Sequence, residues 1–244
     1  MDFNGFDLSC YQQGINYDEL ADKGSFVILK IGEADFKDKV FETHFAECKK
    51  RGLWIGGYYF SHATTVEQAK QEALRCLDYI KGKESDFDMP IFIDVETKEQ
   101  MKIGKDKLAD VIIAFCDTIR QNSECAYGVY ANPNFFENYI SKYKIFKRKD
   151  IQVWLAHWTE DSNKQSSYTY GQQVWQWGVT EIDGMAVDGD VSFKRYASRE
   201  KNVAAIIYKD YIEIPNICNS CAEEIKKTLE KQGYTVIIIK WSAI

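Results

Sequence analysis

The chain has 244 residues, of which 45% are hydrophobic and 14% aromatic, so it can bury the core of one large domain or of one domain with a small appendage. Its formal net charge of −6 argues against nucleic acid as a partner, because binding phosphates requires a basic face. The N-terminus, MDFNGFDLSC, has no basic start, and no stretch approaches the roughly 18 apolar residues of a membrane span. We therefore expect a protein made in the cytoplasm without a signal peptide, in contact with neither nucleic acid nor a membrane.

The seven cysteines lack the even, dense spacing of a small disulfide-stapled protein. Cys218 and Cys221 form a C-x-x-C pair, whereas the others are scattered, which favours reduced thiols. His62 and His157 have no second ligand at the spacing of a metal site. We expect neither a metal ion nor a cofactor.

Along the chain, short apolar runs alternate with helical patterns. Strands are predicted over 26–32, 53–62, 89–96, 126–132, 151–158 and 172–178, and helices over 39–52, 65–80 and 105–121. Thr65 and Gln68 have the spacing of a capping box at the start of the second helix. Repeated strand–helix units predict parallel strands joined by crossovers. No glycine-rich phosphate loop follows the first strand, so an irregular (β/α) barrel is favoured over an open doubly wound sheet.

Acidic residues recur where the predicted strands end. In a barrel the chemistry gathers at the carboxyl ends of the strands, and side chains two residues apart on a strand share a face. The acidic positions are Asp7 in FDLS, Glu33 in KIGE, Asp94 and Glu96 in IDVE, and Asp188 and Asp190 in VDGD. The sequence therefore predicts a group of carboxylates at one end of the barrel.

Aromatic residues occupy other strand ends. They are Tyr58, Tyr59, Tyr130, Trp154, Trp158, Trp175 and Trp177. Glycoside hydrolysis uses one carboxyl that stays protonated and a second that is charged, and aromatic faces stack on sugar rings. Crowded carboxylates raise the pKa of at least one member. Together these features favour a glycoside hydrolase.

Other interpretations of these residues stay open. Asp7 could cap a turn after the first strand, and Asp188 and Asp190 could belong to a turn around Gly189. Trp154 and Trp175 could be core aromatics rather than sugar contacts. At the level of function, the alternatives are a non-catalytic glycan-binding barrel and a hydrolase of another N-acetylated glycan.

The ordered motifs GFDLSCYQ, FVILKIGEAD, IFIDVE, GVYAN, VWLAHW, VWQWG and VDGDVSF resemble glycoside hydrolase family 25, the Chalaropsis-type muramidases of bacteria and phage endolysins. The resemblance extends over roughly residues 3 to 196. It implies an irregular (β/α) barrel that cuts the β-1,4 bond between N-acetylmuramic acid and N-acetylglucosamine in bacterial peptidoglycan. A phage or prophage endolysin, acting on the cell wall after release, is the expected setting.

The resemblance also implies roles for the residues that match its motifs. Glu96 resembles the general acid, and Asp94 the partner that orients the reacting 2-acetamido group or stabilises the oxocarbenium centre. Asp7 and Asp188 resemble the rest of an acidic floor. The residues expected to contact substrate are Glu33, Tyr58, Tyr130, Trp154, Trp175 and Trp177.

The chain departs from the family pattern at two positions. Asp190 stands where asparagine is usual, which adds an acidic group near the floor. Tyr59 stands where histidine is common. Either change is expected to shift the pH optimum or the substrate contacts without removing the acid pair.

The motifs divide the chain into a catalytic domain over 1–196 and a small module over 203–244, which the resemblance does not cover. The sequence of this module predicts a β-α-β unit, with one extended strand over 203–215 and a helix that begins near Asn219. It is a candidate for cell-wall binding or for homo-oligomerisation. Cys218 and Cys221 are either a reactive pair or two incidental thiols.

Overall fold

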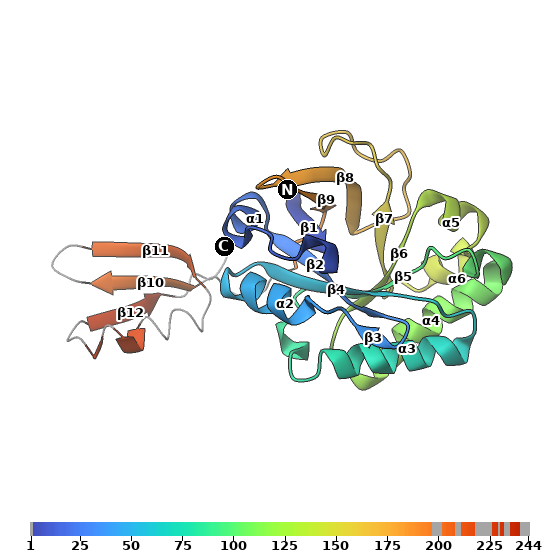
Figure 1. Ribbon diagram of the computed structural model, residues 1–244, viewed down its shortest axis with the longest axis horizontal. Helices are drawn as coiled ribbons and strands as arrows, with labels where there is room; N and C mark the ends of the chain where they lie inside the picture. Colours follow the sequence, from blue (N-terminus) through green and yellow to red (C-terminus); the bar gives the residue numbers. More distant parts are fainter. Residues whose placement is uncertain are drawn as a thin grey trace.

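A computed structural model describes residues 2–196 and, further along the chain, 202–207, 211–217, 226–228, 230–231 and 235–239. Within this part of the chain, eight strands close into a barrel with helices around it (Figure 1), as expected from the sequence. The barrel strands are β1 (Phe3–Leu8), β2 (Phe26–Glu33), β4 (Trp54–Phe60), β5 (Ile91–Asp94), β6 (Tyr127–Ala131), β7 (Gln152–Ala156), β8 (Val174–Ile182) and β9 (Met185–Ser192).

Strand order around the barrel is β1-β2-β4-β5-β6-β7-β8-β9, and β9 returns to β1. Neighbours are parallel from β1 to β8, whereas β9 is antiparallel to both β8 and β1. The short β3 (Phe36–Lys37) folds back on the end of β2 as a hairpin. The strand–helix alternation therefore predicted the barrel but not the direction of its last strand.

A tight turn at Asp183 and Gly184 explains the reversal. Ile182 pairs with Met185, and both turn residues have positive φ, 48° and 77°. An Asp–Gly pair suits a two-residue hairpin of this kind, because aspartate and glycine tolerate left-handed backbone. Asp188 and Asp190 lie beyond this turn, inside β9, so the interpretation of Asp188–Gly189–Asp190 as a turn is wrong.

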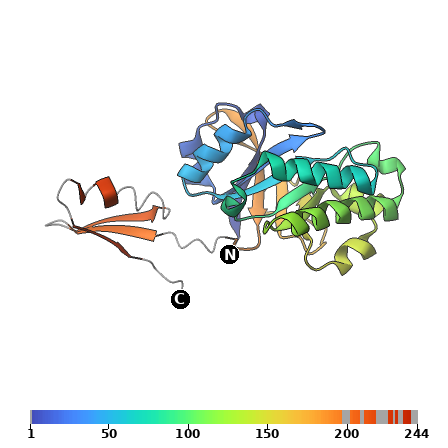
Figure 2. The same ribbon diagram turned by 90° about the horizontal axis from the view of Figure 1, so that it is seen from below.

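Helices on the outside follow most of the barrel strands. They are α1 (Tyr17–Lys23), α2 (Phe41–Lys50), α3 (Val66–Tyr79), α4 (Lys105–Asn122), α5 (Pro133–Asn138) and α6 (Lys142–Lys147). The longest two, α3 and α4, lie side by side (Figure 2). The predicted capping box begins α3, since Thr65 accepts from the Gln68 amide and the Gln68 side chain accepts from the Thr65 amide. Single-turn 3-10 helices are η1 (Cys10–Gln12), η2 (Glu84–Asp86) and η3 (Gln100–Lys102).

The interior of the barrel has a lower layer made of apolar side chains, called here the apolar floor. Its buried members are Phe26, Ile28, Trp54, Met89, Phe92, Trp154 and Val174. Gly128 makes room for it, because a Cβ at this position would lie 2.6 Å from the Phe92 ring. Above the floor, toward the carboxyl ends of the parallel strands, the inward positions become polar. The site therefore stands on a close-packed base.

In the C-terminal module, the described residues form a second sheet in the order β11-β10-β12, with antiparallel pairs throughout. Its strands are β10 (Asn202–Ile207), β11 (Tyr211–Ile217) and β12 (Thr235–Ile239). The extended strand expected over 203–215 is thus two strands, which pair as a hairpin. Residues 226–228 and 230 are helical, within the expected helix. Cys218 and Cys221 lie outside the described residues.

Across the described ranges, we find no helix with both the length and the apolar character needed to cross a bilayer. The five cysteines of the barrel domain are all free thiols, and four of them are buried. This agrees with the reduced state expected for them from their spacing.

Candidate active site

Four of the predicted acidic residues meet at the carboxyl end of the barrel. Asp7 lies on β1 opposite Asp188 on β9, and the antiparallel register places both on one face. Asp94 is the last residue of β5 and is 4% exposed. Glu96 comes just after the strand and is exposed to solvent. With Asp190 these residues form what we call the carboxylate cluster.

Burial dominates the electrostatics of the cluster. It raises the pKa of Asp7 to about 8, helped by the negative charge of Asp188. Burial and the charge of Glu96 raise the pKa of Asp94 well above its usual value. The pKa of Glu96 is raised mainly because protein atoms remove part of the water around its carboxyl group, while Lys30 opposes that shift. Asp7 therefore keeps its proton near neutral pH, and the protonated forms of Asp94 and Glu96 are favoured relative to free carboxyls.

Lys30 is a functional residue that sequence reasoning missed. It lies on β2 within the apolar run FVILKIG, and it forms an ion pair with Glu33. Its positive charge lowers the pKa of both Asp94 and Glu96. A lysine in the middle of a buried strand was the available signal, because a charged group is rarely buried without a partner. Glu33 thus lies beside the cluster as the partner of Lys30.

Gln176 on β8 was also missed, although it connects most of the site. Its side-chain amide donates to Asp7 at 2.8 Å and to Asp188 at 3.4 Å. Its carbonyl oxygen accepts from the Tyr130 hydroxyl and the Trp158 indole, both at 3.0 Å. All four hydrogen-bonding positions of the carboxamide are therefore used. A polar residue between two tryptophans in a buried strand was its signal.

Asp190, the departure from the family pattern, is fully buried on β9. One of its oxygens accepts a hydrogen bond of 2.8 Å from the Trp154 indole. The other oxygen, Oδ2, accepts no hydrogen bond from the described residues. Burial, followed by the nearby Asp7, raises the pKa of Asp190 well above its usual value. Burial therefore favours the protonated form of Asp190, which can act as a donor as the usual asparagine amide would.

The aromatic residues divide into two groups. Tyr58 and Tyr130 are half-buried beside the cluster, and their rings contact Trp154 at centroid distances of 5.9 and 4.4 Å. Trp154 and Trp175 are 1% and 0% exposed. As described, neither offers a free face to a sugar, so the core interpretation suits both better than the predicted substrate contact.

Trp177 and Trp158 lie nearer to solvent. Trp177 is half-buried, and its ring covers Gly189, where a Cβ would lie 2.4 Å from the indole. Trp158 follows β7 and is 53% exposed, with its indole nitrogen on Gln176. Trp158 is therefore the better candidate platform at this end of the barrel, although Trp154, and not Trp158, was expected from the sequence to contact substrate.

Tyr59 lies away from the cluster. It is fully buried on the outer face of β4, 6.3 Å between ring centroids from Phe115 of α4. Its hydroxyl donates to the Ala34 carbonyl at 2.7 Å. The expected effect of this departure on the pH optimum or the substrate contacts therefore has no direct contact with the cluster to support it.

Comparison with known proteins identifies related sequences and folds. The model of the family described as glycosyl hydrolases family 25 matches residues 6–185. No curated protein sequence matches the chain.

Solved structures with the same barrel include the CTP1L endolysin, with 21% identity, a TM-score of 0.65 and coverage of 79% of this chain and 66% of that one. The modular autolysin LytC of Streptococcus pneumoniae, also solved with a synthetic peptidoglycan ligand, has 21% identity and a TM-score of 0.66 over 79% of this chain and 47% of that one. The spore cortex lytic enzyme SleM of Clostridium perfringens has 18% identity and a TM-score of 0.67, covering 100% and 89%. The chain thus spans just under two thirds of CTP1L and about half of LytC.

Proposed function

The chain belongs to family 25 of the glycosyl hydrolases, and from this premise we propose that it is a lysozyme-type N-acetylmuramidase. Its proposed reaction is hydrolysis of the β-1,4 bond between N-acetylmuramic acid and N-acetylglucosamine in bacterial peptidoglycan. The observation that carries the proposal is the pair at the end of β5, with Asp94 buried and Glu96 exposed two residues later.

In this proposal Glu96 is the general acid. It is exposed, so a substrate oxygen can reach it, and its raised pKa favours the protonated form that a general acid needs. Glu96 donates this proton to the glycosidic oxygen as the C1–O bond breaks. The resulting carboxylate then takes a proton from the water that attacks C1 in the second step.

The nucleophile we propose is the acetamido oxygen of the substrate sugar, which attacks C1 and forms a cyclic oxazolinium. Asp94 suits the supporting role, because its Oδ1 is buried and receives no hydrogen bond from the described residues. It can accept the acetamido N–H and balance the charge that develops on that group. Lys30 supports the ionised form of Asp94 by lowering its pKa.

Three hydrogen bonds of Gln176 make the aromatic and amide residues part of the same site. Gln176 orients Asp7 and Asp188 through its amide, and Trp158 offers an exposed ring next to that amide. Half-buried Tyr58 and Tyr130 are proposed to contact the sugar beside the acid pair. Trp177 and Glu33 are also proposed to contact the substrate, because both are partly exposed and lie near the cluster.

The test is to digest purified peptidoglycan, reduce the new ends with borohydride and identify the reduced sugar. Reduced muramic acid is expected. Reduced glucosamine would instead indicate a glucosaminidase, and no new reducing ends would favour a binding barrel or another glycan. The first anomer released tests the nucleophile, because retention gives the β-anomer and an initial α-anomer would contradict it.

We also propose that the enzyme acts as a phage or prophage endolysin on the cell wall. The likeness to the CTP1L endolysin in fold supports this setting. Cell-wall binding and self-association of residues 203–244 stay proposals, each open to a direct test with the intact chain in sedimentation and wall-binding experiments.

A further inference from the structure

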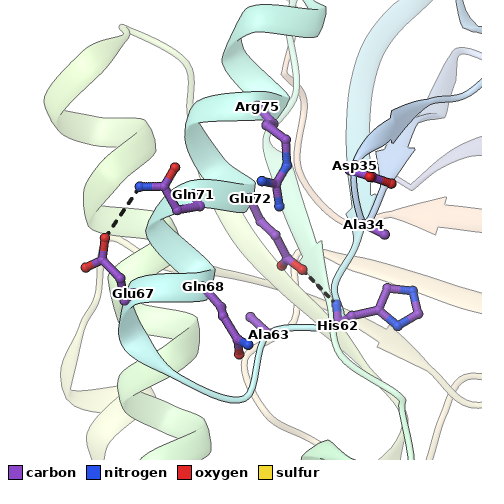
Figure 3. Close-up of a pocket in the computed structure, with 9 residues that line it drawn as sticks. All are labelled: Ala34, Asp35, His62, Ala63, Glu67, Gln68, Gln71, Glu72 and Arg75. Carbon is purple, nitrogen blue, oxygen red and sulfur yellow. Dashed lines mark hydrogen bonds between the residues drawn. The ribbon is translucent and has the colours of Figure 1, made fainter.

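A pocket of about 530 Å³ opens beside the carboxylate cluster, between α3 and the ends of β2 and β4. We call it the α3 pocket (Figure 3). Its lining residues are Ala34, Asp35, His62, Ala63, Glu67, Gln68, Gln71, Glu72 and Arg75. Its volume lies within the range of about 300–1,000 Å³ that is usual for small-molecule sites. Nothing in the proposed hydrolysis uses these residues.

Arg75 supplies the positive charge of the pocket. Figure 3 shows its side chain on the side of α3 that faces Ala34 and Asp35, with the guanidinium next to Glu72. Its Nε is buried, and no described residue hydrogen-bonds it. The hydroxyl of Tyr59 lies against the guanidinium and raises the pKa of Arg75, so the group stays charged. A buried donor without a partner costs free energy, which a bound carboxylate would recover.

Acidic groups also line this pocket. Asp35 is exposed at the β2–β3 turn, and no described side chain hydrogen-bonds its carboxylate. Glu67 accepts from Gln71 at 3.4 Å. Glu72 is buried and accepts from the Ser61 hydroxyl at 2.5 Å and the His62 amide at 3.0 Å. The lining can therefore attract an amine as well as a carboxylate.

This chemistry does not suit a sugar chain. N-acetylglucosamine is uncharged, and the lactyl carboxyl of N-acetylmuramic acid is uncharged once a peptide is linked to it. Sugar rings are usually held on aromatic faces, whereas His62 is the one aromatic side chain among the lining residues. A short peptide with both a carboxylate and a free amine fits the mixed charges better. Peptidoglycan carries such a peptide, because a stem with acidic and diamino residues branches from the lactyl group of its muramic acid.

The pocket lies next to the proposed reaction centre. His62 Nε2 is 4.0 Å from a Glu33 oxygen, and Glu33 forms an ion pair with Lys30. Lys30 acts electrostatically on Asp94 and Glu96. A peptide branching from a sugar at the cluster could therefore reach the pocket along the rim.

We propose that the α3 pocket binds the stem peptide of peptidoglycan, with Arg75 on a peptide carboxylate and Asp35 toward a free side-chain amine. The inference rests on the proposed function for the identity of the polymer. It makes the enzyme a reader of the peptide as well as of the glycan, and it predicts that strands with a free stem amine are preferred over strands in which that amine is acylated by a cross-link.

Direct binding tests the pocket without any need for turnover. The intact protein is titrated with a free stem tripeptide and followed by amide chemical shifts, which are expected to move and saturate at Ala34 and His62. Arg75→Gln should weaken binding by about tenfold or more, the size of one charge-assisted hydrogen bond. Asp35→Asn, at an exposed turn where folding is not at risk, should weaken it several-fold.

Two matched controls sharpen the titration. Arg120→Gln changes an exposed arginine of α4 and should leave peptide binding as in the original protein. A tripeptide with its side-chain amine acetylated should bind more weakly than the free amine. Absence of saturable binding would overturn the proposal. So would an affinity in Arg75→Gln and in Asp35→Asn that equals the affinity of the original protein.

Kinetics then separate this inference from the proposed function. The ratio of kcat/KM on peptide-bearing strands to kcat/KM on strands stripped of peptide is expected to exceed about tenfold and to approach one in Arg75→Gln. A ratio near one in the original protein would overturn the peptide pocket while the muramidase proposal stands. Failure to cut either strand would contradict the muramidase proposal, and the titration would still decide the pocket.

Discussion

Burial has opposite energetic effects on the two layers of side chains inside the barrel. The apolar floor is built from buried rings and branched chains, whereas the layer above it contains polar side chains that are also buried. These are Asp7, Asp94, Asp190 and Gln176. Burial stabilises the floor, at about 25 cal/mol for each Å² of apolar surface. The same burial disfavours the charged forms above it, as the raised pKa values of Asp7 and Asp94 show. The floor thus supports the fold, and the upper layer is costly to the fold but suited to proton transfer.

Trp154 joins the two layers and shows how they depend on each other. Its ring packs against Phe92 of the floor at 5.4 Å between centroids, and its indole nitrogen donates to Asp190 above. The rigid floor therefore fixes the position of an acidic group that has few other partners. A site of this kind needs a well-packed base, because a small displacement would leave its buried polar atoms unpaired.

Glu96→Gln, in the upper layer, should have the largest effect, which is a loss of activity without a loss of stability. The amide cannot donate a proton of suitable acidity, so we expect kcat to fall by about 10² to 10⁴ while stability barely changes. Release of reducing ends and urea denaturation measure the two quantities. Glu99→Gln, at an exposed neighbouring position, should behave like the original protein. Near-normal turnover of Glu96→Gln would refute its assignment as the acid.

Phe92→Ala should lower stability much more than activity, because it removes a buried ring from the apolar floor. We expect the free energy of unfolding to fall by about 3–5 kcal/mol, from the lost burial and the cavity left behind. Activity per folded molecule should fall by much less than in Glu96→Gln. Urea denaturation checks this, with Tyr143→Ala at a 77% exposed site as the control. A loss of stability no larger than the control would show that the floor can collapse around the gap.

Asp190→Asn should stabilise the protein in a pH-dependent way. Since burial raises the folded-state pKa of Asp190, its contribution to stability is complete below the unfolded pKa of about 3.9 and is lost as pH rises toward the folded value. Asparagine has no such loss and can still donate to Asp7. We expect a gain of about 1–3 kcal/mol near pH 8 and little near pH 4.

Denaturation at both pH values measures that gain. Asp22→Asn, at an exposed position of α1, should show no comparable difference between them. An Asp190→Asn protein that is less stable than the original at pH 8 would mean that Asp190 is not held in its neutral form.

Lys30→Met should have the smallest effect, a displacement of the pH–rate profile. Lys30 lowers the pKa of Asp94 and Glu96, so its removal raises both, and the profile of kcat/KM moves to higher pH. We expect about one pH unit, the usual scale of a nearby charge. Lys98→Met, at an exposed position, should leave the profile in place. A shift toward acid would contradict the role given to Lys30.

Local patterns were enough to predict most of the fold. The apolar runs and helical spacings predicted the barrel strands, and Asp94 and Glu96 were placed together because residues two apart on a strand share a face. The return of β9 was missed, although Asp183–Gly184 carried a local turn signal. The alternation of strands and helices stops at this turn, which takes the place of a helix between the last two barrel strands.

The rest of the site depends on register around the barrel, which has no local signature. Gln176 and Asp7 are 169 residues apart in sequence, and only closure of the sheet brings them within 2.8 Å. Trp154 and Trp158 belong to the same motif, yet one is buried in the floor and the other is exposed beyond the end of β7. Their spacing alone cannot distinguish these layers, because the strand end decides which side chain reaches solvent.

The pairing of β1 with β9 has a consequence for the order of folding. The first strand of the barrel has its parallel neighbour β2 nearby in sequence, but its other edge waits for a strand that ends at Ser192. Closing so long a loop is slow, and contacts of this range delay the folding transition. During synthesis, which proceeds from the N-terminus, β1 must therefore keep one edge unpaired until almost the whole barrel has left the ribosome. Since Asp7 and Asp188 come from these two strands, the carboxylate cluster is among the last parts of the barrel to assemble.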